Sequence, residues 1–139
     1  KGGSSKIIHL HGEATKACSE NGKRFVQDIG YRAIKHGEKA QDGALLRPFI
    51  VWFGEAVPMI EEAAKVVEQT DILIVIGTSL NVYPAAGLIH YAPVGTPIYL
   101  IDPKDVQPVS RNVHFIKKVA TEGMRELYGI LTEDLTRNQ

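Results

Sequence analysis

The sequence contains little of several features that would point to a particular class of protein. Among its 139 residues there is one cysteine, Cys18, which cannot form an internal disulfide, as expected in a reducing compartment. Lysine and arginine together number 16, and so do aspartate and glutamate. This balance provides no net field to attract nucleic acid or an anionic membrane. We therefore expect no nucleic-acid partner and look for partners at individual sites.

Long apolar runs are absent as well. The longest, such as residues 72–76, are far shorter than the ~20 residues that span a bilayer. Residues 1–5 are followed by no signal-type apolar core. These absences predict a soluble cytoplasmic protein with no membrane partner. The length suits one compact domain, or a piece of one.

Strands and helices are predicted to alternate along most of the chain. Apolar runs favour strands at residues 7–10, 49–53, 72–76, 97–101 and 114–119. Helical spacing of apolar residues favours helices at 58–69, 84–91 and 121–135. We expect the last helix to turn inward Met124, Leu127, Tyr128 and Leu131. The polar, glycine-rich stretch 13–46 predicts an irregular insertion with a short hairpin. The alternation implies an α/β fold with a largely parallel sheet.

Distinctive residues follow the carboxyl ends of the predicted strands, where ligands collect in open α/β sheets. They are His11-Gly12, Gly54-Glu55, Gly77-Thr78-Ser79 and Asp102. Gly77 permits close approach of the backbone to a ligand, and the two hydroxyls after it suit a phosphate or a ribose at a helix N-terminus. Taken alone, this Gly-Thr-Ser sequence is better explained as a strand-to-helix turn with capping hydroxyls.

Three segments in one order and spacing are far more specific than any of them alone. They are His11-Gly12, then Arg47-Pro48-Phe49-Ile50-Val51-Trp52-Phe53-Gly54-Glu55-Ala56-Val57-Pro58, then Gly77-Thr78-Ser79-Leu80-Asn81-Val82-Tyr83-Pro84-Ala85-Ala86-Gly87. With them the chain resembles the C-terminal part of a sirtuin, an NAD-dependent protein-lysine deacylase, from about Ile7 to Leu131. The fold implied is the C-terminal part of a Rossmann-like parallel sheet with a small irregular insertion.

The resemblance also implies a division of the chain into three segments. Residues 1–12 are a strand that carries the catalytic histidine. Residues 13–46 are an insertion that corresponds to the zinc module of the family. Residues 47–139 are the C-terminal part of the NAD-binding domain.

The resemblance makes His11 the general base, which deprotonates a ribose hydroxyl of NAD after the acyl oxygen has attacked the anomeric carbon. Imidazole suits this task because it titrates at roughly pH 6.5, near neutrality. From its position alone, His11 is better explained as a ring that caps the end of a strand.

The resemblance assigns an acyl-lysine protein or peptide substrate to the second segment, at Val51, Phe53, Gly54, Glu55 and Val57. A substrate peptide would add there as a strand, the Val51 carbonyl would accept the amide proton of the acylated lysine, and Phe53 would wall an apolar tunnel. The alternative is that Val51, Trp52 and Phe53 belong to the core. Trp52 is the stronger core candidate because strand alternation turns it away from its neighbours.

The resemblance implies NAD as the cofactor, in contact with Gly77, Thr78, Ser79, Asp102 and Ala120. Asp102 stands where many sirtuins have an asparagine on the adenosine ribose. A carboxylate can accept hydrogen bonds from ribose hydroxyls, as acidic residues do in other dinucleotide folds. Ala120 belongs to a stretch whose backbone contacts adenine in the family.

The segment 13–46 departs from the family. Most sirtuins hold a structural zinc ion there with two Cys-x-x-Cys pairs, and a closed zinc site needs four protein ligands. Only Cys18 and His36 are available in this segment, so we expect no metal and a bacterial-type sirtuin that lacks the zinc cysteines. An apolar cluster of Phe25, Ile29 and Tyr31 is expected to replace the metal.

Two further features of the family are absent: a Gly-Ala-Gly pyrophosphate turn and a Gln-Asn-Ile-Asp strand end. We therefore expect a piece of a longer protein that is inactive alone and self-associates through an exposed sheet face. Two alternatives stay open. One is a module that binds ADP-ribose or an acyl-lysine peptide without chemistry, and the other is an unrelated doubly wound nucleotide-binding protein.

Overall fold

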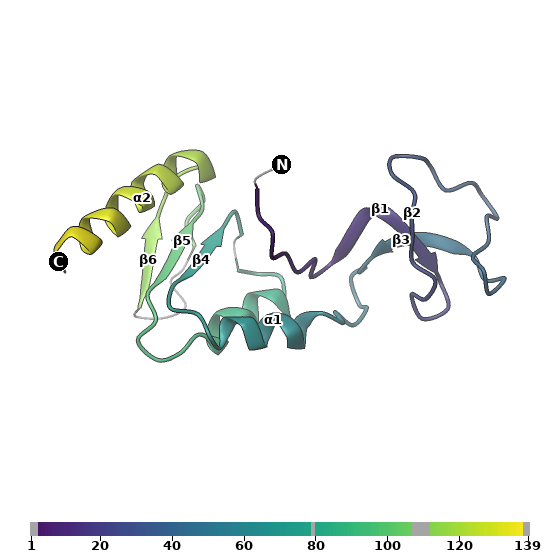
Figure 1. Ribbon diagram of the computed structural model, residues 1–139, viewed down its shortest axis with the longest axis horizontal. Coiled ribbons are helices and arrows are strands. Elements are labelled where there is room, and N and C mark those ends of the chain that lie inside the picture. Colours follow the sequence, from purple (N-terminus) through teal and green to yellow (C-terminus); the bar gives the residue numbers. More distant parts are fainter. Residues whose placement is uncertain (1–2, 79, 107–111, 138–139) are drawn as a thin grey trace. The chain divides into compact units, whose positions relative to one another are not determined.

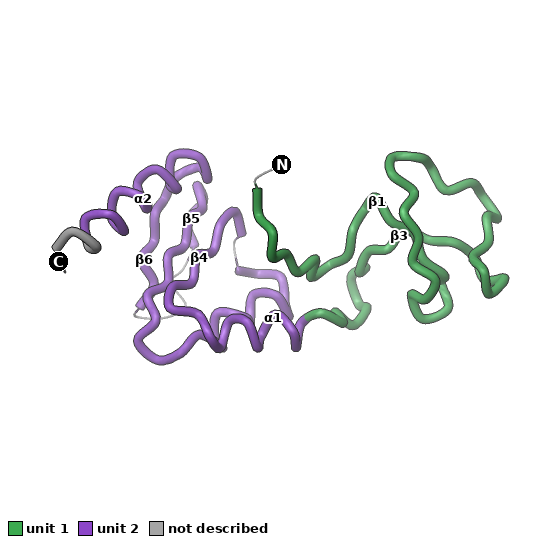
Figure 2. Tube along the Cα trace, viewed as in Figure 1, with its two compact units in different colours: residues 1–59 green, residues 60–139 purple. Residues whose placement is uncertain are grey.

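The chain folds into two compact units, which Figure 2 colours separately. The computed structural model describes residues 3–78, 80–106 and 112–137. Unit 1 comprises residues 1–59 and unit 2 residues 60–139. Both boundaries predicted from the sequence, after residues 12 and 46, fall inside unit 1. Each unit is described by itself below.

Unit 1 is a three-stranded antiparallel sheet in the order β2-β1-β3 (Figure 1). Its strands are β1 (Gly12–Ser19), β2 (Gln27–Asp28) and β3 (Leu46–Ile50). The central strand β1 pairs with both neighbours and buries Ala17, Cys18 and Ser19 completely. Burial raises the pKa of the Cys18 thiol. The last three residues of β1 are therefore buried on both faces of the strand, and all have small side chains.

The segment 13–46 is more regular than the sequence predicted, and the strand expected at 7–10 is wrong. A strand exists only where its backbone is paired, and among the described residues 7–10 pair with none. The Gly12 amide instead donates to the His9 carbonyl at 3.1 Å, which closes a turn just before β1. The strand expected at 49–53 also ends early, at Ile50, and a turn follows it.

The apolar cluster expected within the insertion does not form. Tyr31 is 98% exposed and Phe25 44% exposed, and Phe25 lies in the left-handed region at φ 53°, a turn that strand alternation does not anticipate. Polar contacts are found in this region instead. The Ser19 hydroxyl donates to Asp42 at 2.7 Å, and a loop is closed by an ion pair described below. Among the described residues, no three His, Cys, Asp or Glu side chains gather in a way that could hold a metal ion.

Unit 2 is built around a parallel three-stranded sheet in the order β4-β5-β6 (Figure 1). Its elements are α1 (Ile60–Val67), β4 (Leu73–Ile76), the 3-10 helix η1 (Ala85–Tyr91), β5 (Ile98–Ile101), β6 (Val113–Ile116) and α2 (Ala120–Arg137). Unit 2 combines this parallel sheet with the helices α1 and α2, so the predicted α/β class is confirmed.

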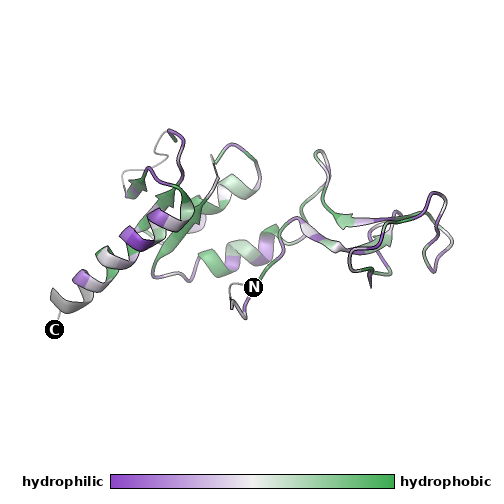
Figure 3. Cartoon of the chain, turned by 90° about the horizontal axis from the view of Figure 1, so that it is seen from above, coloured by the Kyte–Doolittle hydropathy of each residue, from purple (hydrophilic) through white to green (hydrophobic). Residues whose placement is uncertain are grey.

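The core of unit 2 lies between β5 and α2. All four residues of β5 are buried, and Tyr99, Ile101, Ile116 and Leu127 form one cluster against which Leu131 packs. Figure 3 shows the strands in the green of hydrophobic residues, while α2 also bears purple, hydrophilic ones. The helix approaches the sheet closely at Gly123, where a Cβ atom would meet Ile101 Cγ2 at 2.3 Å.

The inward face predicted for the last helix is wrong at two residues. Leu127 is buried as expected, but Met124 is 39% and Tyr128 71% exposed. A helix that lies on a small sheet buries one narrow stripe, here the residues spaced four apart from Gly123, and its flanks stay outside. On β4, Ile74 and Ile76 are 38% and 43% exposed, so this strand is not buried on both faces.

None of the helices among residues 3–78, 80–106 and 112–137 is long and apolar enough to cross a membrane.

Candidate functional site

The predicted base and the predicted substrate segment meet in unit 1. The Val51 amide donates to the His11 carbonyl at 2.9 Å, one position beyond the pair that joins Gly12 of β1 to Ile50 of β3. His11 is exposed to solvent. The sheet therefore places His11 beside the start of the segment that follows β3.

Gly12 makes this approach of two backbones possible. Its φ is 86°, and a Cβ atom there would lie 2.1 Å from the Phe49 carbonyl oxygen. Such a separation is far below van der Waals contact, so any other residue would push β1 and β3 apart. The conformational freedom of Gly12 thus determines where His11 lies.

The turn at residues 51–55, which we call the substrate turn, projects its aromatic rings outward. Phe53 is 94% exposed and Trp52 is 52% exposed, so the alternative that both belong to the core is wrong. The Glu55 amide donates to the Trp52 carbonyl at 3.0 Å, and Gly54 takes a φ of 89° between them. Val57, just after the turn, is buried.

Glu55 lies at the centre of a polar network under the substrate turn. Its carboxylate accepts hydrogen bonds from both Arg47 Nη atoms, at 2.5 and 3.3 Å, and from the Trp52 amide at 3.1 Å. Lys23 Nζ lies 2.9 Å from the same carboxylate. These donors, led by Arg47, lower the pKa of Glu55 from its ordinary 4.5 to about 2.

Neither Arg47 nor Lys23 was predicted from the sequence as a site residue. Arg47 and Glu55 flank the apolar run symmetrically, and opposite charges at the two ends of a strand and turn were an available signal. No pattern could identify Lys23, because it comes from the connection between β1 and β2, far away in sequence.

Gly77 and Asp102, two of the predicted NAD residues, lie at the carboxyl edge of the sheet in unit 2. The last residues of the three strands, Ile76, Ile101 and Ile116, are in register. Gly77 continues this alignment, since its amide donates to the Ile101 carbonyl at 2.9 Å. Asp102 follows β5 directly, and its amide donates to the Ile116 carbonyl at 3.4 Å.

The side chains at this edge differ in accessibility. Asp102 is only 6% exposed, and its Oδ1 accepts a hydrogen bond from the Lys104 amide at 2.8 Å. Gly77 has a φ of 68° and open space where a Cβ atom would stand. Thr78 Oγ1 accepts from the Leu80 amide at 3.2 Å. Ala120, the first residue of α2, is exposed, whereas Ser79 lies outside the described residues.

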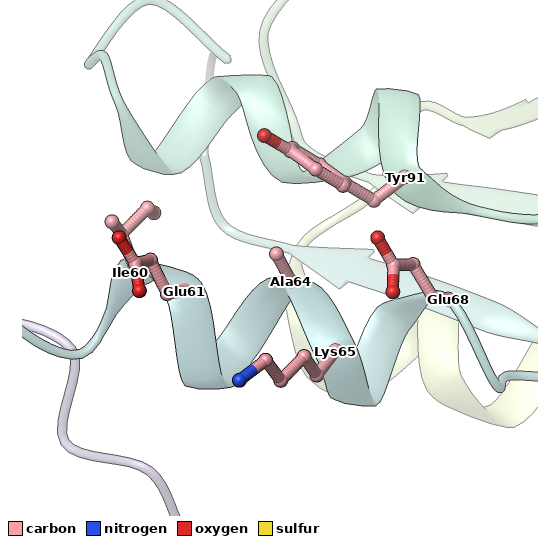
Figure 4. Close-up of a pocket in the computed structure, with 6 residues that line it drawn as sticks. All are labelled: Ile60, Glu61, Ala64, Lys65, Glu68 and Tyr91. Carbon is pink, nitrogen blue, oxygen red and sulfur yellow. The ribbon is translucent and has the colours of Figure 1, made fainter.

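A cavity of about 300 Å³ lies elsewhere in unit 2, between α1 and η1 (Figure 4). Its lining residues are Ile60, Glu61, Ala64, Lys65, Glu68 and Tyr91. Figure 4 shows Glu61 and Lys65 on α1 and Glu68 just after its end, with the Tyr91 ring opposite them. None of these residues is a predicted site residue, and the charged ones are exposed.

Comparison with known proteins identifies the family of this chain. Residues 1–84 match the model of the Sir2 family. The chain therefore belongs to the Sir2 family.

Its relatives include NAD-dependent protein deacylases of two bacteria. The chain is 53% identical over 137 residues to the one from Bacteroides thetaiotaomicron, covering 94% of this chain and 58% of that protein. It is 46% identical over 137 residues to the one from Helicobacter pylori, covering 96% of this chain and 57% of that protein. The chain thus spans less than two thirds of the relatives that it matches.

Solved structures show the same fold. A Sir2 homologue in complex with NAD superposes with a TM-score of 0.79 at 32% identity, covering 96% of this chain and 54% of that one. A Sir2 protein bound to a propionylated peptide superposes with a TM-score of 0.72 at 27% identity, covering 90% and 56%.

Proposed function

We propose that the protein to which this sequence belongs removes acyl groups from protein lysines in an NAD-dependent reaction that releases nicotinamide and O-acyl-ADP-ribose. The observation that carries this proposal is the hydrogen bond of 2.9 Å between His11 and Val51, which joins the predicted base to the predicted substrate turn. The 53% identity to a deacylase of Bacteroides thetaiotaomicron supports it.

His11 is proposed to accept a proton from a ribose hydroxyl. Its exposure leaves the imidazole accessible to a ligand, and the bond from Val51 to its carbonyl fixes its backbone. When bound, NAD supplies an electrophilic anomeric carbon and nicotinamide as the leaving group. A positioned imidazole that removes the hydroxyl proton contributes typically 100-fold or more to such a reaction.

The substrate turn is proposed to bind the acyl-lysine. The Val51 carbonyl accepts the amide proton of the acylated lysine, and the exposed ring of Phe53 covers its apolar stem. Gly54, Glu55 and Val57 complete the segment: Gly54 permits the turn, Glu55 holds it, and Val57 anchors its end in the core.

The carboxyl edge of the parallel sheet is proposed to hold the adenosine part of NAD. Gly77 leaves its backbone open to a ligand. The buried Asp102 uses Oδ1 in its bond to Lys104, and Oδ2 has no hydrogen bond among the described residues, so Oδ2 is proposed to accept from ribose hydroxyls. These features fit a dinucleotide. The other proposed contacts are Thr78, Ser79 and Ala120.

His11→Ala in the full-length protein tests the proposal. With NAD and an acetyl-lysine peptide, nicotinamide release is expected to fall on the order of 100-fold while the far-ultraviolet circular dichroism is unchanged. An unchanged rate would remove His11 from the mechanism. Peptide binding without nicotinamide release by the wild-type protein would favour a module that binds without chemistry.

Two further predictions from the sequence remain proposals. A cytoplasmic location is supported by the single cysteine, which is a free thiol in β1. Self-association is supported by the exposure of Ile74 and Ile76 on β4, whose outer edge has no strand partner among the described residues.

A further inference from the structure

The conformation of the substrate turn requires an explanation, because apolar packing does not supply it. Phe53 and Trp52 are both exposed, and a turn that projects its two largest side chains outward buries little apolar surface of its own. Its backbone has one internal hydrogen bond, from the Glu55 amide to the Trp52 carbonyl. The position of the turn must therefore depend on contacts with other parts of unit 1.

The Glu55 carboxylate provides these contacts. It accepts from the Trp52 amide within the turn, from the guanidinium of Arg47 in β3, and from Lys23 in the connection after β1. Arg47 also donates to the Ile50 carbonyl at 3.4 Å and lies 6.0 Å from the centre of the Trp52 ring. One side chain thus ties the turn to two other segments of the chain.

The network is partly withdrawn from solvent. The side chains of Lys23, Arg47 and Glu55 are 18%, 21% and 30% exposed. An ion pair in this setting is less screened than one at an open surface, and an arginine that binds both oxygens of a carboxylate also fixes its orientation. Lys23, Arg47 and Glu55 therefore form a fixed ion-pair network rather than a mobile surface pair.

We propose that Glu55 is a positioning residue that holds the substrate turn, through Arg47, Lys23 and the Trp52 amide, in the conformation that an acyl-lysine peptide requires. The inference rests on the proposed function of residues 51–57. It assigns Glu55 no contact with the substrate. It also assigns Lys23 and Arg47 a role in peptide binding, which gives the insertion a function other than holding a metal.

Glu55→Gln tests the inference, because it removes the charge and keeps the size of the side chain. In the full-length protein, the KM for an acetyl-lysine peptide is expected to rise about tenfold, with kcat and the KM for NAD little changed. The emission of Trp52, which is the single tryptophan of these 139 residues, is expected to change because Arg47 is no longer held beside its ring.

Glu38→Gln is the matched control. Glu38 also binds both Nη atoms of an arginine, Arg32, at 2.7 and 3.0 Å, and accepts a backbone amide, from Lys35, at 2.9 Å. It lies in the same unit but has no contact with the substrate turn among its described interactions. Both the peptide KM and the Trp52 emission are expected to stay at wild-type values.

Lys23→Gln replaces this test if Glu55→Gln does not fold. Lys23 makes one ion pair with Glu55, so its substitution is expected to raise the same KM by a smaller factor. The inference alone would be overturned if the wild-type protein is active but the peptide KM is unchanged in both Glu55→Gln and Lys23→Gln. It would also be overturned if Glu38→Gln raises the peptide KM by the same factor. A wild-type protein that removes no acyl group would overturn the proposed function, and the inference with it.

Discussion

At the scale of single residues, exposure separates function from packing in the substrate turn. Side chains that stabilise a fold are buried, and truncating them leaves a cavity. Phe53 is 94% exposed, so its ring contributes almost nothing to packing within the chain. A large apolar ring on an open turn is well suited to contact a ligand instead.

Phe53→Ala is therefore expected to weaken the use of acyl-lysine peptides while it changes the free energy of unfolding by less than ~0.5 kcal/mol. Peptide KM and melting temperature are the two measurements. Tyr31→Ala is the control, since Tyr31 is 98% exposed in the same unit but outside the turn, and neither quantity is expected to move. A large loss of stability in Phe53→Ala would show that the Phe53 ring belongs to the core.

The ionisation of Glu55 predicts how unit 1 responds to acid. Arg47 and Lys23, which face its carboxylate, hold its pKa at about 2 instead of its ordinary 4.5. A carboxylate whose pKa is lowered by folding stabilises the fold above its unfolded pKa and loses this effect as the pH falls toward its folded pKa. The contribution is thus present above pH 4.5 and lost between pH 4.5 and about 2.

The melting temperature of the wild-type chain, measured by Trp52 fluorescence, is accordingly expected to fall between pH 4.5 and pH 3, within that window. Glu55→Gln is expected to begin lower and fall less, because it has no charge to lose. Equal pH dependence in the two proteins would show that Glu55 is not held as the structure indicates. The comparison with the variant is needed because the pKa of Glu38 is also lowered to about 2, by Arg32.

At the scale of elements, two glycines determine how closely neighbours pack. Gly12 allows β1 to approach β3, and Gly123 allows α2 to approach β5. In each unit the glycine lies at the contact between two elements that support the candidate site.

Gly12→Ala is expected to destabilise unit 1 more than Gly43→Ala does. Both positions have φ near 80°, which costs an alanine roughly 1–2 kcal/mol. A Cβ atom at Gly43 meets nothing within 4 Å, whereas one at Gly12 meets the Phe49 carbonyl oxygen. Denaturant unfolding is expected to show a further loss of about 1–3 kcal/mol in Gly12→Ala. Equal losses would contradict the close pairing of β1 and β3.

Two substitutions in α2 are expected to act with opposite signs. Gly123→Ala inserts a methyl group against Ile101 and is expected to destabilise the fold by about 1–3 kcal/mol. Gly129→Ala meets nothing within 4 Å and is expected to stabilise it by roughly 0.5–1 kcal/mol, because alanine loses less backbone entropy in a helix. Thermal unfolding of both variants checks the packing of α2 on β5.

At the scale of the whole molecule, the chain spans 58% of its relative from Bacteroides thetaiotaomicron. The residues proposed for chemistry are divided between units 1 and 2. Orientation of the reacting groups supplies much of the rate of such a reaction. The sequence itself contains no Gly-Ala-Gly turn of the kind that holds the pyrophosphate in the family.

The 139-residue chain by itself is therefore expected to release no nicotinamide from NAD in the presence of an acetyl-lysine peptide. The full-length protein, assayed in parallel, is expected to do so. Weak binding of ADP-ribose to the chain is expected to persist through Gly77 and Asp102, and Asp102→Ala should abolish it. Comparable turnover by the two proteins would mean that these residues build a complete NAD site.

The sequence by itself determined the elements of unit 2 and the family. Continuous apolar runs and helical spacing identified β4, β5, α1 and α2 to within a few residues, because these patterns depend on local periodicity. The order of the three motifs indicated the family that residues 1–84 match. The carboxyl edge that holds Gly77 and Asp102 followed from the parallel sheet alone.

Only the tertiary structure decided the shape of unit 1. Its strands pair antiparallel across long separations, and its ion pairs join residues such as Lys23 and Glu55 that no local pattern relates. Periodicity assigned Trp52 to the core because it assumes that a strand continues, whereas β3 ends at Ile50 and a turn exposes the ring. Pairing of distant segments, which sets where strands begin and end, depends on the energy of the folded whole and leaves no periodic trace in the sequence.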